Sequence, residues 1–244
     1  MPVQADLVMN PVETLLDSRG FVIRPAPFFQ EILQIGEADW SAFAASWNDL
    51  GPDRFMADGG RYRRRRFSAL KVTGASYASK PHQAHFQSRD HNALNGDVQR
   101  WFDPVREATL ESPVLAGILG LFTASFDRLD GRSEGATWHT EVHQFRVETS
   151  LLETGRPTPE GLHRDGVDWV LVLLIRRENV EQGVTEIGGP DGALFGKFTL
   201  ETPGDLVLLD DRKIRHGVTP IVPEDPSAPA YRDVLVVTWR AEAA

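Results

Sequence analysis

The sequence predicts a mainly β protein in which helices flank a jelly-roll core. The first third of the chain carries apolar residues at helical spacing, and a second helical stretch lies near mid-chain. After about residue 138 the pattern changes to short apolar segments separated by Gly, Pro and Asp turns. A series of strands with no helices between them is typical of a sandwich or jelly roll and disfavours βαβ units.

The N-terminal half is expected to supply the flanking helices and one strand. The first predicted helix ends at Gly20, and the third has Asp39 as its candidate N-cap and Gly51 as its stop. Helices are predicted at residues 12–21, 28–36, 39–51, 101–110 and 112–129, and a strand at residues 61–74.

The C-terminal half is expected to form the core. Its predicted strands lie at residues 139–149, 168–177, 185–192, 197–202, 205–211, 216–222 and 232–240. No internal repeat or low-complexity linker divides the chain, and 244 residues suits one β-rich domain. We therefore predict a single domain over residues 1–244. Within this domain, residues to about 137 are expected to form a helical support region. Residues from about 138 to 241 are expected to form the metal-binding core, a cupin-like double-stranded β-helix.

Composition and charge narrow the partners and the compartment. A net charge of −9 argues against a nucleic-acid or anionic-membrane surface. The basic run at residues 61–67 is interpreted as a strand face or as the lining for an anionic small molecule. The N-terminus lacks the pattern of a signal peptide, and the longest apolar run, near residues 170–175, is too short to span a bilayer. We expect a cytoplasmic protein that binds a small molecule. The protein could form a homodimer.

Metal-ligating residue types stand two positions apart at the start of a predicted strand. His163 and Asp165 follow a turn-rich segment and run directly into the largely apolar residues 167–175. Residues i and i+2 of a strand point to the same face about 6.6 Å apart, so both can reach one ion. His216 follows another strand and adds a second imidazole. Two histidines and one carboxylate form the facial triad of non-haem Fe(II) oxygenases, which leaves coordination positions open.

A cationic residue, Arg232, opens the last predicted strand. A guanidinium forms a bidentate, charge-assisted pair with a carboxylate. Such a group can hold the distal carboxylate of a 2-oxoglutarate bound at the open metal positions. The sequence therefore predicts Fe(II) as the metal, with 2-oxoglutarate and O2 as co-substrates.

A second histidine-rich strand competes for the metal. His139, Glu141 and His143 alternate, but positions i and i+4 of a strand lie about 13 Å apart and cannot close around one ion without a bulge. They are expected to line the pocket or to form a hydrogen-bonding face. Three more histidines fall in a polar segment and are expected in a solvated loop: His82, His85 and His91.

Three segments resemble the bacterial 2-oxoglutarate/Fe(II) dioxygenases typified by L-isoleucine dioxygenase, a family that also includes BsmA-like biofilm-stress proteins. They are GRPTPEGLHRDGVDWV, LLDDRKIRHGVTPI and YRDVLVVTW, and the VHQFR segment resembles the family's strand facing the active site. The resemblance covers roughly residues 138–240 and is looser in the N-terminal third. It implies a jelly roll in which His163, Asp165 and His216 bind Fe(II) as the catalytic centre and Arg232 binds 2-oxoglutarate.

The resemblance also implies that an aliphatic C–H of a free L-amino acid, with Ile, Leu and Met first, is hydroxylated as 2-oxoglutarate is decarboxylated to succinate. Such a substrate must be held by its own carboxylate and ammonium. Arg146 or an arginine of the basic run, such as Arg63, could meet the carboxylate, and Gln144 lies by alternation on the face of Arg146. Glu141 or Glu160 could meet the ammonium. The other interpretation of the basic run is a solvated strand edge.

Three alternatives stay open. The first is a dioxygenase of the same kind that acts on a modified amino acid, a peptide or a secondary metabolite. The second is a non-catalytic, cupin-like stress or biofilm sensor, which would not need an open Fe(II) face. The third is a metal-dependent isomerase or dioxygenase on a related barrel without 2-oxoglutarate, which would have no use for Arg232.

Overall fold

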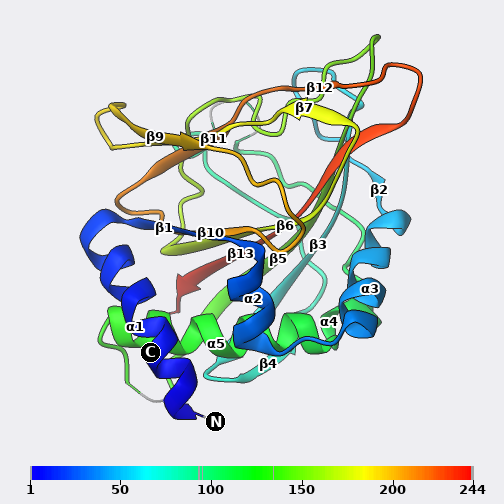
Figure 1. Cartoon of the computed structure of the whole chain (residues 1–244). Coiled ribbons are helices and arrows are strands. Elements are labelled where there is room, and N and C mark those ends of the chain that lie inside the picture. The colour runs from blue at the N-terminus through cyan, green and yellow to red at the C-terminus, as the bar shows by residue number, and fades with distance from the viewer. Residues whose placement is uncertain (1, 93, 95, 134, 243–244) are drawn as a thin grey trace.

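The centre of the fold is an eight-stranded antiparallel sheet, seen in the computed structural model in Figure 1. The structure describes residues 2–92, 94, 96–133 and 135–242, and the side chains of residues 2–8 are outside that description. The sheet follows the order β1-β10-β6-β13-β5-β3-β2, with β4 paired to β3. Its strands are β1 (Phe21–Arg24), β2 (Gly51–Pro52), β3 (Arg63–Thr73), β4 (Ser76–Ser79), β5 (Trp138–Thr149), β6 (Trp169–Glu178), β10 (Leu206–Asp210) and β13 (Ala230–Ala241).

Two smaller sheets lie over one face of the main sheet, and the helices cover the other (Figure 1). The smaller sheets join β11 (Arg215–Val218), β8 (Thr185–Gly188) and β9 (Leu194–Phe198), and β12 (Ile221–Pro223) and β7 (Val180–Gln182). The helices are α1 (Pro2–Arg19), α2 (Ala26–Leu33), α3 (Glu37–Ala45), the 3-10 helix η1 (Ser46–Asp49), α4 (Glu107–Leu110) and α5 (Pro113–Leu129). The predicted jelly roll with helices packed outside is confirmed.

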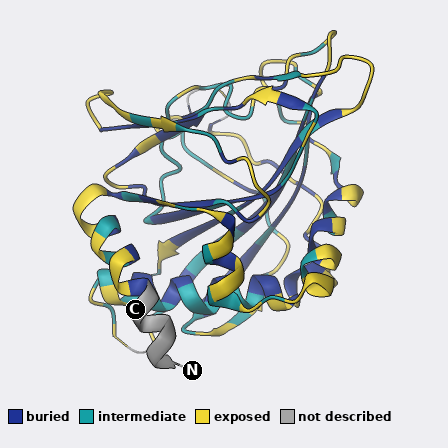
Figure 2. Cartoon of the chain, in the orientation of Figure 1, coloured by how far each residue is buried: buried dark blue, intermediate teal, exposed yellow. Residues whose placement is uncertain are grey.

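Strand alternation gives the main sheet one face for the core and one for a pocket. On β13, Leu235, Val237 and Trp239 are buried in the core against the helices, and Trp239 donates to Thr123 of α5 at 2.9 Å. The intervening residues of β13 line a pocket on the opposite face. Burying each large side chain stabilises the fold by about 1.5–3 kcal/mol. Figure 2 shows the central strands of the main sheet mostly in the colour of buried residues.

Helix α5 is the main cover of the core face. Pro113 occupies its first turn, and the hydroxyl of Ser112 accepts from the backbone N–H of Leu115 at 3.2 Å, which caps the helix. Its buried positions recur at helical spacing and include Ile118 and Phe122. The helix therefore fixes the back of the sheet, whose front carries the pocket.

Some local expectations were wrong. Helix α3 begins at Glu37 after Gly36, so Asp39 lies in the first turn and is not the N-cap. A carboxylate there still favours the positive end of the helix dipole. Gly51 belongs to β2 and does not end the helix. Residues 101–106 are not helical.

The predicted division of the chain does not coincide with the sheet. Strands β1 and β3 belong to the expected support region, yet both pair within the main sheet. The predicted border near residue 137 therefore separates strands that share one sheet. Within the part of the chain that the structure describes, no helix is long and apolar enough to cross a membrane.

Candidate metal centre and pocket

His163 and His216 stand opposite each other on neighbouring segments. Each backbone N–H donates to the carbonyl of the other at 2.9 Å, and the ring centroids are 4.6 Å apart. Asp165 reaches both rings: Oδ1 lies 3.5 Å from Nε2 of His163, and Oδ2 lies 3.7 Å from Nε2 of His216. One ligand atom from each residue falls within 4.8 Å of the others. This spacing suits three ligands of one ion.

Burial and mutual charge set the protonation of these three groups. Burial lowers the pKa of His216 to about 4, and the charge of His163 acts in the same direction. Burial raises the pKa of Asp165, but the hydrogen bond with His163 and the charges of both histidines outweigh it and hold that pKa well below its usual range. Burial also opposes protonation of His163, yet the hydrogen bond and charge of Asp165 raise its pKa to about 9. Burial and these charges thus favour an ionised Asp165 and a neutral His216, the forms in which a carboxylate and an imidazole bind a metal ion.

A backbone carbonyl orients the first histidine. Nδ1 of His163 lies 3.1 Å from the carbonyl oxygen of Gly161. A carbonyl only accepts, so Nδ1 carries hydrogen and Nε2 is left as the ligand atom once its own proton has gone. Two imidazole nitrogens and one carboxylate oxygen then form a donor set that fits Fe(II) with open positions.

The carboxylate of Asp211 fixes the turn that carries Asp165. Its Oδ1 accepts from the backbone N–H of Asp165 at 2.9 Å, and its Oδ2 accepts from Gly166 at 2.8 Å and Val167 at 3.2 Å. The side chain is fully buried, and burial with the nearby charge of Asp165 raises the pKa of Asp211 to about 6. Sequence reasoning missed this residue, although it lies in the DDR segment just before His216.

A wall of the site that sequence reasoning also missed is formed by His85, Gln87, Asn92 and Arg100. The amide of Gln87 donates to Oδ1 and to the backbone carbonyl of Asp165 at 3.3 Å. The ring of His91 packs on Gly166, where a Cβ would come within 2.5 Å of the ring. Gly166 has a φ of +80°, so this position requires glycine on two counts.

Arg232 projects from β13 into the same pocket. It is 2% exposed, and no described residue accepts a hydrogen bond from its Nε or Nη2. Burial and the charge of Arg177 lower its pKa to about 10, so it remains cationic at neutral pH. A buried guanidinium with two unused donors needs an anion, because a buried donor without a partner costs free energy. A planar carboxylate matches the two donors.

A second histidine–carboxylate cluster lines the pocket, formed by His85, Glu141 and His143. Glu141 Oε2 lies 3.2 Å from Nδ1 of His85 and 3.3 Å from Nε2 of His143. His85 is 5% exposed, so the expectation of a solvated loop was wrong for this histidine. His82 is exposed, and its ring contacts Trp101.

The hydrogen bonds of two histidines beside Glu141, His139 and His143, oppose metal binding at the second cluster. Arg65 Nη2 lies 2.7 Å from Nδ1 of His143, and Lys80 Nζ lies 2.8 Å from Nδ1 of His139. A cation can only donate, so each Nδ1 accepts and the hydrogen sits on Nε2. Both Nε2–H groups then face Glu141, at 3.3 Å. This differs from His163, whose Nδ1 donates, and it leaves the His163–Asp165–His216 cluster as the candidate metal centre.

The remaining predicted substrate residues divide between the two faces of the sheet. Arg63 and Glu160 line the pocket, and Glu160 Oε1 lies 3.8 Å from Nε2 of His163. Gln144 and Arg146 lie on the helix side: the amide of Gln144 donates to Ser46 at 2.7 Å. The prediction that Gln144 and Arg146 share one face of β5 agrees with the structure. The pocket, however, is lined by the residues of the opposite face, which include Glu141 and His143.

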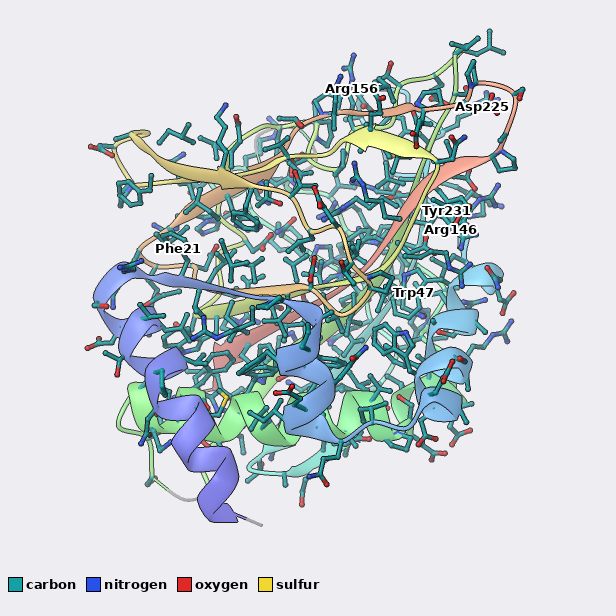
Figure 3. The ribbon with its side chains drawn as sticks, in the orientation of Figure 1. Phe21, Trp47, Arg146, Arg156, Asp225 and Tyr231 are labelled. Carbon is teal, nitrogen blue, oxygen red and sulfur yellow. The ribbon has the colours of Figure 1, made fainter. Side chains whose placement is uncertain are left out.

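Arg146 binds another protein group in place of a substrate. Its Nε and Nη2 each donate to the carboxylate of Asp233 at 2.7 Å, and its guanidinium stacks over Tyr231 at 4.1 Å. Figure 3 shows Arg146 and Tyr231 side by side. The substrate role expected for Arg146 is therefore corrected, because its donors are used in a bidentate ion pair away from the pocket.

The chain belongs to the 2OG-Fe dioxygenase family, whose model matches residues 44–238. Members of this family use Fe(II), 2-oxoglutarate and O2, and the predicted family resemblance is thereby confirmed. All the residues of the candidate metal centre, together with Arg232, fall inside the matched range.

Individual relatives agree with the family. The chain is 24% identical over 155 residues to 3(1)-hydroxy-L-isoleucine 4-dioxygenase from Pantoea ananatis, covering 63% of this chain and 62% of that protein. It is 25% identical over 156 residues to L-isoleucine-4-hydroxylase from Bacillus thuringiensis, covering 64% of each. The match thus spans less than two thirds of these curated relatives.

Solved structures extend the comparison over nearly the whole chain. A bsmA homolog from Methylobium petroleophilum is 35% identical with a TM-score of 0.86, covering 95% of this chain and 92% of the homolog. The IDO structure from Bacillus thuringiensis has a TM-score of 0.78 at 19% identity, covering 96% of both chains. This second likeness supports the fold alone.

Proposed function

We propose that this protein is an Fe(II)- and 2-oxoglutarate-dependent dioxygenase that hydroxylates an aliphatic C–H of a free L-amino acid. One O2 supplies one oxygen atom to the substrate as hydroxyl and one to succinate, while 2-oxoglutarate loses its C1 carboxylate as CO2. The observation that carries this proposal is the placement in one pocket of His163, Asp165, His216 and Arg232, whose Nε and Nη2 have no partner among the described residues.

Each residue has a separate task in this proposal. His163, Asp165 and His216 would hold Fe(II), which when bound supplies the oxidising chemistry with O2 and 2-oxoglutarate. Arg232 would bind the distal carboxylate of 2-oxoglutarate and so orient it. Asp211 and Gly161 fix the ligands, and apolar side chains such as Val172, Val234 and Val236 restrict water in the pocket.

The amino-acid substrate is supported by the names of the relatives and by the pocket. Both curated relatives are named for 4-position chemistry on isoleucine or its hydroxylated form. The apolar part of the pocket wall would accept an aliphatic side chain, so Ile, Leu and Met are the first substrates to test. A modified amino acid, a peptide or a secondary metabolite would use the same metal chemistry. A non-catalytic sensor would use none of it.

The test is a succinate-release screen of the twenty amino acids with Fe(II), ascorbate and 2-oxoglutarate. The expected result is succinate and a hydroxylated product, identified by mass, with one or a few aliphatic amino acids, and none with His216→Ala. Turnover of an N-acylated or peptide-bound substrate alone would overturn the free-amino-acid part. Fe(II) and 2-oxoglutarate that bind normally without any turnover across all these substrates would favour the sensor.

A further inference from the structure

Two buried arginines line the pocket without a role in metal or 2-oxoglutarate binding. Arg65 is 3% exposed and Arg100 is 2% exposed, and both lie on the pocket wall. No described residue accepts a hydrogen bond from Nε of either side chain. Two buried cations that each keep a free donor beside a cavity indicate a place for an anion.

Packing holds Arg65 in place while leaving this donor unused. Its guanidinium lies between two aromatic rings, 3.9 Å from the centroid of Phe102 and 4.4 Å from that of Phe145. Its Nη2 donates to His143 at 2.7 Å, and its Nη1 lies 3.9 Å from the carboxylate of Asp53, which is closer to Arg63 at 2.8 Å. Asp53 is thus shared by two arginines and lies closer to Arg63 than to Arg65.

Arg100 is held in place by one terminal nitrogen of its guanidinium and by its backbone. Its Nη2 donates to the side-chain carbonyl of Gln87 at 2.9 Å, and its backbone pairs with His85 in both directions. Gln87 in turn contacts the metal-ligand carboxylate of Asp165. A group bound at Arg100 would therefore lie within the same pocket as the metal centre.

An ionised carboxylate accompanies the two arginines. Glu141 accepts hydrogen from imidazoles on both sides, and these contacts hold its pKa well below its usual range despite burial. Arg65 contacts His143 and Arg100 pairs with the backbone of His85, and both histidine rings contact Glu141, so the two arginines are linked to this carboxylate through one histidine each. Cationic and anionic groups adjacent on one wall match a zwitterion.

We propose that Arg65 and Arg100 bind the α-carboxylate of the amino-acid substrate and that Glu141 binds its α-ammonium. This assignment rests on the proposed function and specifies where the substrate headgroup lies. The headgroup site is separate from the 2-oxoglutarate anchor, because Arg232 lies on β13 and Arg65 on β3, and β5 runs between these two strands. Two separate anion sites suit a reaction that binds two carboxylate-bearing molecules together.

The test measures binding directly, without turnover. Protein loaded with Mn(II) and 2-oxoglutarate is titrated by calorimetry with L-isoleucine, L-leucine and L-methionine, and with leucinamide and N-acetylleucine. The wild-type protein should bind at least one of the three amino acids. Leucinamide lacks the carboxylate and N-acetylleucine lacks the ammonium, so each should bind about 30-fold or more weakly than L-leucine. Because this arm uses only the wild-type protein, it does not depend on whether a variant folds.

Substitutions then assign the charges to residues. Arg65→Gln and Arg100→Gln should each raise the amino-acid Kd about 30-fold or more, while the Kd of 2-oxoglutarate stays within twofold. Glu141→Gln should weaken L-leucine binding more than binding of N-acetylleucine, which lacks the ammonium. The matched control is Arg64→Gln, on the same strand but facing away and paired with Glu148 at 2.7 Å, which should bind like the wild-type protein.

The outcomes separate this inference from the proposed function. If 2-oxoglutarate binds normally but leucine and leucinamide bind equally well, the headgroup site is wrong and the dioxygenase stands. Unchanged amino-acid binding in folded Arg65→Gln and Arg100→Gln would have the same meaning. A second Mn(II) per chain, lost in Glu141→Gln, would replace the headgroup site with a metal site. Failure of the wild-type protein to bind 2-oxoglutarate would overturn both proposals.

Discussion

Replacing Arg232 by alanine should weaken 2-oxoglutarate binding strongly without removing the metal. The guanidinium is 2% exposed and has two donors that no described residue uses, so a bound carboxylate would be almost fully desolvated against it. Removing one partner of a buried, hydrogen-bonded charge pair costs about 2–5 kcal/mol. At 1.4 kcal/mol for each factor of ten, the Kd should rise about 30- to 3,000-fold.

The assay is calorimetric titration of 2-oxoglutarate into Mn(II)-loaded protein without O2. Arg232→Lys should recover part of the loss, because a point charge replaces only one of two parallel hydrogen bonds. Arg240→Ala is the matched control, since Arg240 is exposed on the same strand. An unchanged Kd in folded Arg232→Ala would refute the assignment.

Three further substitutions test contacts at the metal centre and on the opposite face of the main sheet. Asp211→Asn replaces one of the two oxygens that hold the backbone of residues 165–167, and the metal Kd, measured by calorimetry, should rise about 10- to 100-fold; an unchanged Kd would remove Asp211 from the metal site. Arg146→Ala leaves the buried Asp233 unpaired and should cost about 3–5 kcal/mol in urea unfolding, with the 2-oxoglutarate Kd unchanged. Burial already raises the pKa of Asp233, and losing Arg146 raises it further. At pH 5 the folded variant can protonate Asp233, whereas at pH 8 it must keep an unpaired buried charge, so the destabilisation should be larger at pH 8. Equal losses of stability at the two pH values would contradict this. Gly166→Ala should lower stability by about 1 kcal/mol or more and weaken metal binding, because its φ is positive and His91 occupies the Cβ position; a stability equal to that of the parent would refute this.

The sequence predicts well those features that depend on neighbours along the chain. The fold class follows from short apolar segments with the pattern of β-strands and from the turn residues between them. Both can be recognised without knowledge of distant contacts. The grouping of His163 with Asp165 rests on strand alternation, and His216 follows a strand that could be recognised from its apolar run. The structure brings these three side chains together.

Features that depend on distant contacts could not be predicted. Alternation separates the residues of β5 into two sets but does not say which face is covered by helices, so Arg146 was placed in the pocket when Asp233 binds it instead. The burial of His85 depends on a loop that folds back against Glu141. Asp211 accepts from backbone groups 44 to 46 residues earlier in the chain, and only the folded arrangement shows that contact.

The most direct test of the metal assignment is anaerobic Fe(II) titration of the wild-type protein and two histidine variants, with calorimetry giving stoichiometry. The wild-type protein and His143→Ala should each bind one Fe(II) per chain, because the hydrogen bond from Arg65 makes His143 a donor toward Glu141. His216→Ala should bind none at the same concentrations. Full binding in His216→Ala together with loss in His143→Ala would contradict the assignment and transfer the metal centre to the second cluster.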